Sequence, residues 1–132
     1  MATITKEVRS PRPAAEVWAL LRDFAAVHEL AKGFVASTEM EPSGARLVTF
    51  VNGVQVREWL VSADDQAMRL VYAINDSPNY THYSAAAQVV PDEEGSRFVW
   101  TVDFLPDAMA PAQDAAMAAG IAAIGRNLGA AR

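Results

Sequence analysis

Glu58 is the residue of this sequence whose type and setting best suit acid–base chemistry. It lies in a run where apolar and polar residues alternate, the pattern of a strand with one covered face. An apolar setting raises the pKa of a carboxyl group, so Glu58 could act as a general acid or base or hold a ligand hydroxyl. Tyr72 and Tyr83 lie in later runs of the same kind and could share proton transfer with it. The alternatives are that Glu58 is a structural carboxylate bonded to Tyr72, or that it is exposed because the assumed strand register is wrong.

The elements that would position these side chains follow from periodicity. Thr3 to Arg9 alternates as a strand, and apolar residues at helical spacing then predict a short helix from Ala14 to Phe24 and a second from Ala25 to Leu30. Six β-rich runs separated by turn residues follow, from Phe34 to Leu105. A helix from about Asp107 to about Leu128 closes the chain, and its many Ala and Gly residues predict unfilled volume beneath it.

The turns assign side chains to one face of the sheet or the other. Asn52-Gly53 predicts a two-residue type I′ hairpin, which would pair Leu47 with Glu58. Further turns would place Tyr72 opposite both Glu58 and Tyr83, and the last turn would place Tyr83 near Phe104. The predicted covered face comprises Leu47, Thr49, Val56, Glu58, Leu60, Leu70, Tyr72, Ile74, Tyr83, Ala85, Ala87, Phe98, Trp100, Val102 and Phe104.

This register puts Arg46 and Arg57 on the opposite, polar face, so Glu58 has no cation beside it. Desolvation would then dominate its pKa, and Glu58→Gln would keep or raise stability near neutral pH.

The predicted ligand-binding residues are those expected to line a cavity between the sheet and the long helix. Tyr72, Tyr83, Trp100 and Phe104 could form its walls or simply pack in the core. The remaining predicted ligand contacts are Glu58, Leu60, Leu70 and His28. His28 is included because the second short helix would lie near an entrance, and the alternative is an ordinary surface histidine. Trp59 falls on the outer face, where it could pack or form an interface.

Composition excludes several other classes of function. The net charge is -5 and the arginines are scattered singly, which disfavours nucleic acid. The sequence contains no run of about 18 apolar residues, so it predicts no membrane span. Its first residues do not resemble a secretory signal. With no cysteine and two distant histidines, we expect no metal site and no cofactor, and a cytoplasmic location. The sequence is compatible with a homodimer.

Several short motifs occur in an order that resembles the START-like superfamily, also called Bet v 1-like or SRPBCC. They are Ser10-Pro11, Val17-Trp18, Leu20 to Phe24, Asn52-Gly53 followed by Arg57-Glu58, Arg69 to Tyr72, and Val99 to Thr101 before Phe104. The nearer resemblance is to bacterial proteins of the polyketide cyclase/dehydrase type. It implies the helix-grip fold with a central hydrophobic cavity for lipids, sterols, hormones or polyketides, in proteins that range from carriers to cyclases.

The sequence therefore predicts one α+β domain spanning residues 1–132, with a seven-stranded curved antiparallel sheet wrapped around the C-terminal helix. Its 52% apolar content is enough for one core. The leading function is binding of a hydrophobic or aromatic small molecule in the cavity. The alternatives are a polyketide cyclase or dehydratase using Glu58 with Tyr72 or Tyr83, and a protein-interaction module using the outer sheet face around Trp59.

Overall fold

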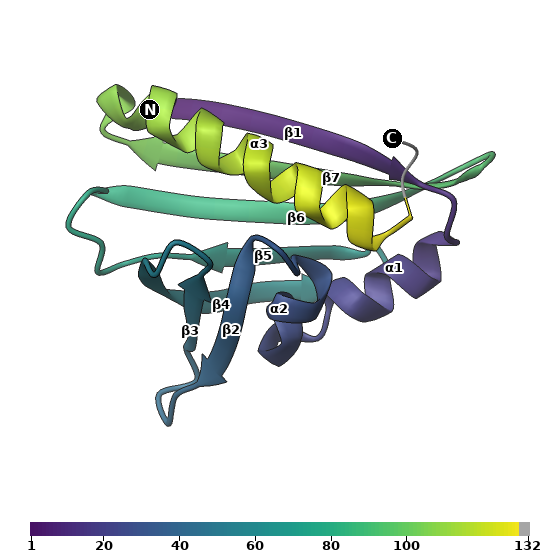
Figure 1. Ribbon diagram of the computed structural model, residues 1–132, viewed down its shortest axis with the longest axis horizontal. Coiled ribbons are helices and arrows are strands. Elements are labelled where there is room, and N and C mark those ends of the chain that lie inside the picture. Colours follow the sequence, from purple (N-terminus) through teal and green to yellow (C-terminus); the bar gives the residue numbers. More distant parts are fainter. Residues whose placement is uncertain (130–132) are drawn as a thin grey trace.

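The computed structural model describes residues 1–129 and contains one seven-stranded antiparallel sheet with a long helix across one face (Figure 1). In chain order the elements are β1 (Ala2–Ser10), α1 (Ala14–Leu21), η1 (Phe24–Ala26), α2 (Val27–Leu30), β2 (Val35–Met40), β3 (Arg46–Phe50), β4 (Gln55–Asp64), β5 (Arg69–Ala73), β6 (His82–Asp92), β7 (Gly95–Leu105), η2 (Asp107–Met109) and α3 (Ala110–Asn127). The predicted order of elements is confirmed.

The sheet order β1-β7-β6-β5-β4-β3-β2 makes β1 and β2 the two edges. Figure 1 shows α3 lying along β1 and β7, while β2 and β3 stand away from it across the concave face. The helix therefore covers the half of the concave face near β1 and β7. It leaves the half near β2 to β4 uncovered.

The buried stripe of α3 fixes the helix to the sheet. Met117, Ile124 and Leu128 are buried, as their helical spacing predicts, and they join a core with Val102 and Phe104. The Ser10 hydroxyl donates a hydrogen bond to the Leu128 carbonyl at 2.8 Å, which attaches the helix end to β1. Packing is therefore tight at this end of α3.

Polar side chains of other elements help to attach the short helices to the rest of the fold. Asp65, in the β4–β5 turn, accepts a hydrogen bond from Trp18 Nε1 at 2.9 Å, and the same carboxylate oxygen lies 3.0 Å from Arg22 Nε in an ion pair. Asn127 donates to the carbonyls of Leu30 and Lys32 at 2.9 and 3.0 Å. These bonds hold α1 to the sheet and the end of α2 to α3, which fixes one wall of the concave space.

The hairpin between β3 and β4 differs from the sequence prediction. Its register pairs Arg46 with Glu58 and Thr49 with Gln55, and Phe50 donates to the Val54 carbonyl at 2.8 Å, so the loop has three residues. Gly53 has φ +89 while Asn52 does not have a positive φ, which excludes type I′ and fits a loop with glycine last. The predicted pairing of Leu47 with Glu58 is therefore wrong by one residue.

This one-residue shift exchanges faces on β3, because strand side chains alternate. Arg46 and Val48 lie on the concave face and are buried, while Leu47 and Thr49 lie on the other. The predicted partners of Tyr72 on β4 and β6 are also wrong, by two residues each, since Tyr72 pairs with Leu60 and Ala85. An even shift preserves the face. The predicted β6–β7 pairing, with Tyr83 opposite Phe104, is confirmed.

Candidate functional site

A cavity of about 650 Å³ lies between α3 and the concave face of the sheet, and most of its lining is apolar. Pockets of roughly 300–1,000 Å³ with few polar groups are typical sites for small molecules. Exposed residues mark where the cavity opens: Val51 and Val54 on the β3–β4 hairpin, Asn79 before β6, and alanines of α3. The structure thus contains the volume that the Ala-rich helix predicted.

Small residues on α3 create this volume. Ala112, Ala115, Ala116 and Ala119 present only methyl groups to the cavity. A Cβ atom built on Gly120 would lie 2.9 Å from Trp100 and 3.1 Å from Phe34, so glycine allows these two rings to approach the helix. Larger side chains on this face of α3 would occupy the space or push the sheet away.

A buried ion pair forms one part of the cavity wall. Arg46 donates from Nε to Glu58 Oε1 at 2.8 Å, and its Nη2 lies 2.7 Å from the same oxygen. The two residues are only 4% and 6% exposed. The Arg46 guanidinium also donates from Nη1 to the Phe24 carbonyl at 3.1 Å, and its Cζ lies 3.9 Å from the Phe24 ring centroid and 5.1 Å from that of Tyr72. Arg46 thereby joins β3, β4 and η1.

Aromatic hydroxyls form a second polar group in the wall. Trp100 Nε1 donates to the Tyr72 hydroxyl at 3.1 Å, and Gln113 Nε2 donates to the Tyr83 hydroxyl at 3.4 Å. The Tyr80 hydroxyl donates in turn to Gln113 Oε1 at 2.5 Å. Gln113 is buried on α3, so it links the helix to β6 and to the loop before it.

Burial governs the protonation of these groups. It raises the pKa of the Glu58 carboxyl, and the attraction and hydrogen bonds of Arg46 offset only part of that effect. Burial also raises the pKa of Tyr72 and of Tyr83, and the negative charge of Glu58 raises both further. Both tyrosines are therefore protonated phenols, and each accepts the hydrogen bond described above while keeping its own proton.

We expect carboxyl ¹³C NMR to give Glu58 a pKa above its ordinary value of 4.5, with its signal assigned by its loss in Glu58→Gln. A raised folded pKa means that the contribution of Glu58 to stability is fully present below the unfolded value. It is lost as pH rises through the folded value. A measured pKa at or below 4.5 would show that Arg46 outweighs burial.

The structure brings four of the eight predicted site residues to the cavity: Glu58, Tyr72, Tyr83 and Trp100. Leu70 and Phe104 are buried on the same face but pack in the core, outside the cavity lining. Leu60 is 46% exposed, next to the register shift that interrupts β4 before Ser62, and does not line the cavity.

His28 also lies outside the cavity lining. Its main-chain N–H donates to Thr38 Oγ1 at 3.3 Å, and its Nδ1 is enclosed without a hydrogen-bond partner. His28 therefore contributes to the α2–β2 contact through its main chain.

Arg46 is the main residue that the sequence prediction missed, because the wrong register placed it on the polar face. Its presence overturns the expectation that Glu58→Gln keeps or raises stability, since that change leaves a buried guanidinium without its counter-ion. The sequence contained a signal for this pairing, because Asn-Gly also fits the end of a three-residue loop. A three-residue loop places Arg46 opposite Glu58, so that the two opposite charges face each other.

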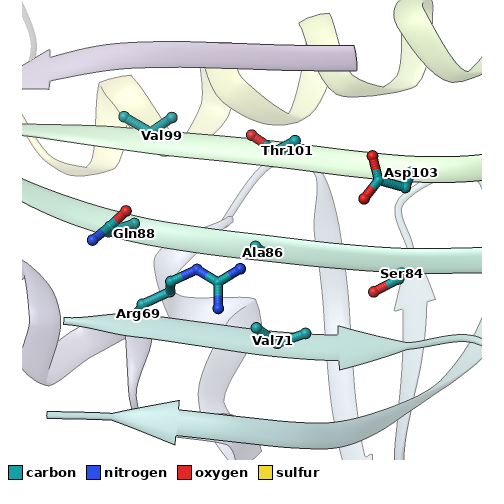
Figure 2. Close-up of a pocket in the computed structure, with 8 residues that line it drawn as sticks. All are labelled: Arg69, Val71, Ser84, Ala86, Gln88, Val99, Thr101 and Asp103. Carbon is teal, nitrogen blue, oxygen red and sulfur yellow. The ribbon is translucent and has the colours of Figure 1, made fainter. Parts of the chain in front are cut away.

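A second hollow, of about 220 Å³, lies on the outer face of β5, β6 and β7 (Figure 2). Its residues include Arg69, Gln88 and Asp103, and Figure 2 shows the Arg69 side chain extending toward Ala86. Within residues 1–129 no second layer covers this face. Trp59 lies on the outer side, as predicted, and is half-buried. The concave cavity is therefore the candidate site.

Among residues 1–129, no three His, Asp or Glu side chains gather in a way that could hold a metal ion. No helix in the same range is both long and apolar enough to cross a membrane.

A seven-stranded antiparallel sheet gripping a C-terminal helix, with a mostly apolar cavity between them, defines the helix-grip class of SRPBCC proteins. The sequence model of the family described as "Polyketide cyclase / dehydrase and lipid transport" matches residues 1–131. The chain belongs to this family. Comparison with curated proteins found no match.

Solved structures share this fold along nearly the whole chain. A protein from Thermobifida fusca is 29% identical, with a TM-score of 0.78 and coverage of 100% of this chain and 99% of that one. The protein XoxI from Bacillus cereus is 21% identical, with a TM-score of 0.85 and coverage of 97% and 96%. The di-domain ARO/CYC BexL from the BE-7585A biosynthetic pathway is 13% identical, with a TM-score of 0.80; the match covers 96% of this chain and 46% of BexL.

Proposed function

We propose that residues 1–132 act as one domain that binds a hydrophobic or aromatic small molecule in the cavity between the sheet and α3. The observation that carries this proposal is the cavity itself, about 650 Å³ in volume, mostly apolar and open between α3 and the β3–β4 hairpin. Apolar walls with a few polar groups provide affinity by burial and orientation by hydrogen bonding. The family, whose description includes lipid transport, is consistent with a carrier.

Native mass spectrometry and a dye assay test the proposal together. We expect protein purified without denaturation to carry a non-covalent organic molecule, or to bind an environment-sensitive apolar dye while its circular dichroism remains native. Aromatic or lipid-like compounds should displace the dye. Dye fluorescence that develops only as the protein unfolds would contradict a preformed site, since unfolding intermediates also bind such dyes.

A second candidate function is a cyclase or dehydratase that uses Glu58 with Tyr72 or Tyr83 for proton transfer. The observation in its favour is that a buried carboxyl group and two protonated phenols line the same cavity. BexL, one of the solved structures with this fold, is described as an ARO/CYC of a biosynthetic pathway. Turnover of a polyketide-like substrate that is lost in Glu58→Gln while binding persists would favour the enzyme over the carrier.

The third candidate, a protein-interaction module, depends on a collapsed cavity and a large apolar patch on the outer face. Instead, the cavity is open, and the outer hollow includes Arg69, Gln88 and Asp103. A small-molecule site is therefore the better proposal.

A further inference from the structure

Strand register fixes a pattern of side chains on the outer face of β5, β6 and β7, on the side of the sheet opposite the cavity. On β6, Gln88 pairs with Arg69 of β5. Ser84 lies on the same face of β6 and pairs with Asp103 of β7. Ala86 lies between Gln88 and Ser84, so it is the centre of this outer patch. Arg69 and Asp103 therefore occupy diagonally opposite corners around Ala86, as Figure 2 shows.

Among the residues that the structure describes, Arg69 is the one arginine of the sheet without a counter-ion. The other arginines of the strands each have an acidic side chain within 4.0 Å; they are Arg9, Arg46, Arg57 and Arg97. Asp64 lies opposite Arg69 in the β4–β5 pair, but its Oδ1 accepts hydrogen bonds from the main chain of Gln66 and Ala67. Arg69 is exposed. Its guanidinium is therefore available to a carboxylate of another molecule.

Asp103 supplies the opposite charge at the other corner of the outer patch. Its Oδ1 accepts a hydrogen bond from Thr3 at 2.6 Å, and within residues 1–129 no side chain donates to its Oδ2. The row between the two corners is uncharged and consists of Val71, Ala86 and Thr101. These side chains leave the hollow of about 220 Å³ described above. The patch thus has one positive corner, one negative corner and an uncharged centre against which a second surface can pack.

A second copy of the same patch complements both charges. A two-fold axis can lie in the plane of the contact, over Ala86 and at right angles to the diagonal that joins the charged corners. Arg69 of each copy then faces Asp103 of the other. Such a contact is isologous and closes as a dimer. The strands of the two sheets cross at a large angle, close to the orthogonal class of sheet packing. Twisted sheets are saddle-shaped, which allows two copies to fit when they cross in this way.

We propose that this outer patch docks a second copy of the chain, oriented by two reciprocal Arg69–Asp103 ion pairs around Ala86. An acidic surface is repelled by Asp103 and a basic surface by Arg69, whereas the same patch on another copy satisfies both. Burial of the uncharged centre supplies affinity, and the charges supply orientation.

The dimer goes beyond the binding function, because the cavity lies on the other face of the sheet and stays open in both copies. The patch spans three strands, so the interface is at the small end of the range, below about 1,200 Å² in total, where complexes are weak. We therefore expect a Kd of about 10–100 µM.

Sedimentation equilibrium at low ionic strength tests for the dimer. Wild-type protein should be mostly monomeric near 1 µM and mostly dimeric near 1 mM, as the expected Kd requires. Wild-type protein that remains monomeric at about 1 mM would overturn the proposal.

Charge reversal locates the contact. Arg69→Asp and Asp103→Arg each place like charges opposite each other twice, so each variant should dimerise at least about tenfold more weakly than the wild type. An equimolar mixture of the two should recover a mixed dimer of near wild-type affinity, because one variant supplies two negative corners and the other two positive corners. Either variant dimerising alone as the wild type does, or a mixture that stays monomeric, would contradict the proposed contact.

Lys32→Asp is the control for net charge. Lys32 is exposed between α2 and β2, away from the outer patch, so the same change of charge there should leave dimerisation unchanged. Circular dichroism establishes that each variant is folded. If a reversal does not fold, Arg69→Gln removes both ion pairs without adding charge and should weaken dimerisation several-fold; a wild-type Kd in that variant counts against the proposal.

Dye binding in the cavity should be the same in all these variants, because neither Arg69 nor Asp103 lines it. Failure of the dimer therefore leaves the binding function standing, and failure of dye binding leaves the dimer standing.

Discussion

Replacing Ala119 with Phe should abolish most of the binding capacity of the cavity while the protein stays folded. Ala119 presents its methyl group to the cavity from α3, so a phenyl ring there occupies volume that a ligand would fill. Losing the burial of one ring-sized portion of a ligand costs about 1.5–3 kcal/mol, which corresponds to roughly a tenfold to hundredfold weaker affinity. Dye titration measures the affinity. The free energy of unfolding, measured by thermal unfolding, should change by less than about 1 kcal/mol, which is the scale of helix propensity.

Ala118→Phe is the matched control for this experiment. Ala118 is adjacent on the same helix, is exposed, and does not line the cavity, so the same substitution should leave dye binding unchanged. Equal losses in both variants would mean that the dye binds elsewhere. Gly120→Phe is unsuitable because its Cβ atom alone would lie 2.9 Å from the Trp100 ring.

Arg46→Met should destabilise the protein more than any other single change considered for this site. It leaves the Glu58 carboxylate buried without a partner, and breaking a buried ion pair costs about 3–5 kcal/mol. The double variant Arg46→Met/Glu58→Leu should recover most of that loss, because apolar residues can replace a buried pair without leaving a charge behind. Urea unfolding of the wild type, both single variants and the double variant gives the coupling energy between the two residues.

Arg57→Met provides the control, because Arg57 carries the same charge on the neighbouring strand and lies on the exposed face. It pairs with Glu41 at 2.7 Å and Asp76 at 3.4 Å near solvent. Exposed pairs contribute little to stability, so this variant should unfold nearly as the wild type does. Similar losses for Arg46→Met and Arg57→Met would contradict the burial of the Arg46–Glu58 pair.

The loss in Arg46→Met should depend on pH in a defined direction. Without Arg46, desolvation raises the folded pKa of Glu58 with nothing to oppose it. The neutral acid is favoured in the folded state, so the variant should be most stable below the unfolded pKa and lose stability as pH rises through the folded one. If the loss of stability in Arg46→Met stays constant from acid to neutral pH, Glu58 is not the cause of that loss.

The sequence by itself determined the order and type of the elements and most of the concave face. Alternation along a strand is a local property, so the burial of Tyr72, Tyr83 and Val102 followed from their own neighbours in the chain. The pairings around Tyr72 were wrong by two residues, yet an even shift leaves each side chain on its face. The Ala and Gly residues of α3 likewise predicted the cavity, because small residues cannot fill the space under a helix.

Only the tertiary structure decided what faces Glu58. Asn52-Gly53 fits both a two-residue and a three-residue loop, and the difference of one residue moves Arg46 from the solvent side to the buried side of β3. Leu60 was likewise predicted on a covered face, and it pairs with the buried Tyr72, but it is 46% exposed. Contacts between distant segments, such as Arg46 with Phe24 or Tyr83 with Gln113, depend on how helices settle on the curved sheet. Local alternation decides which side chains of a strand share a face, whereas which face is buried and which residues pair across a loop depend on loop length and on packing energy summed over the whole core.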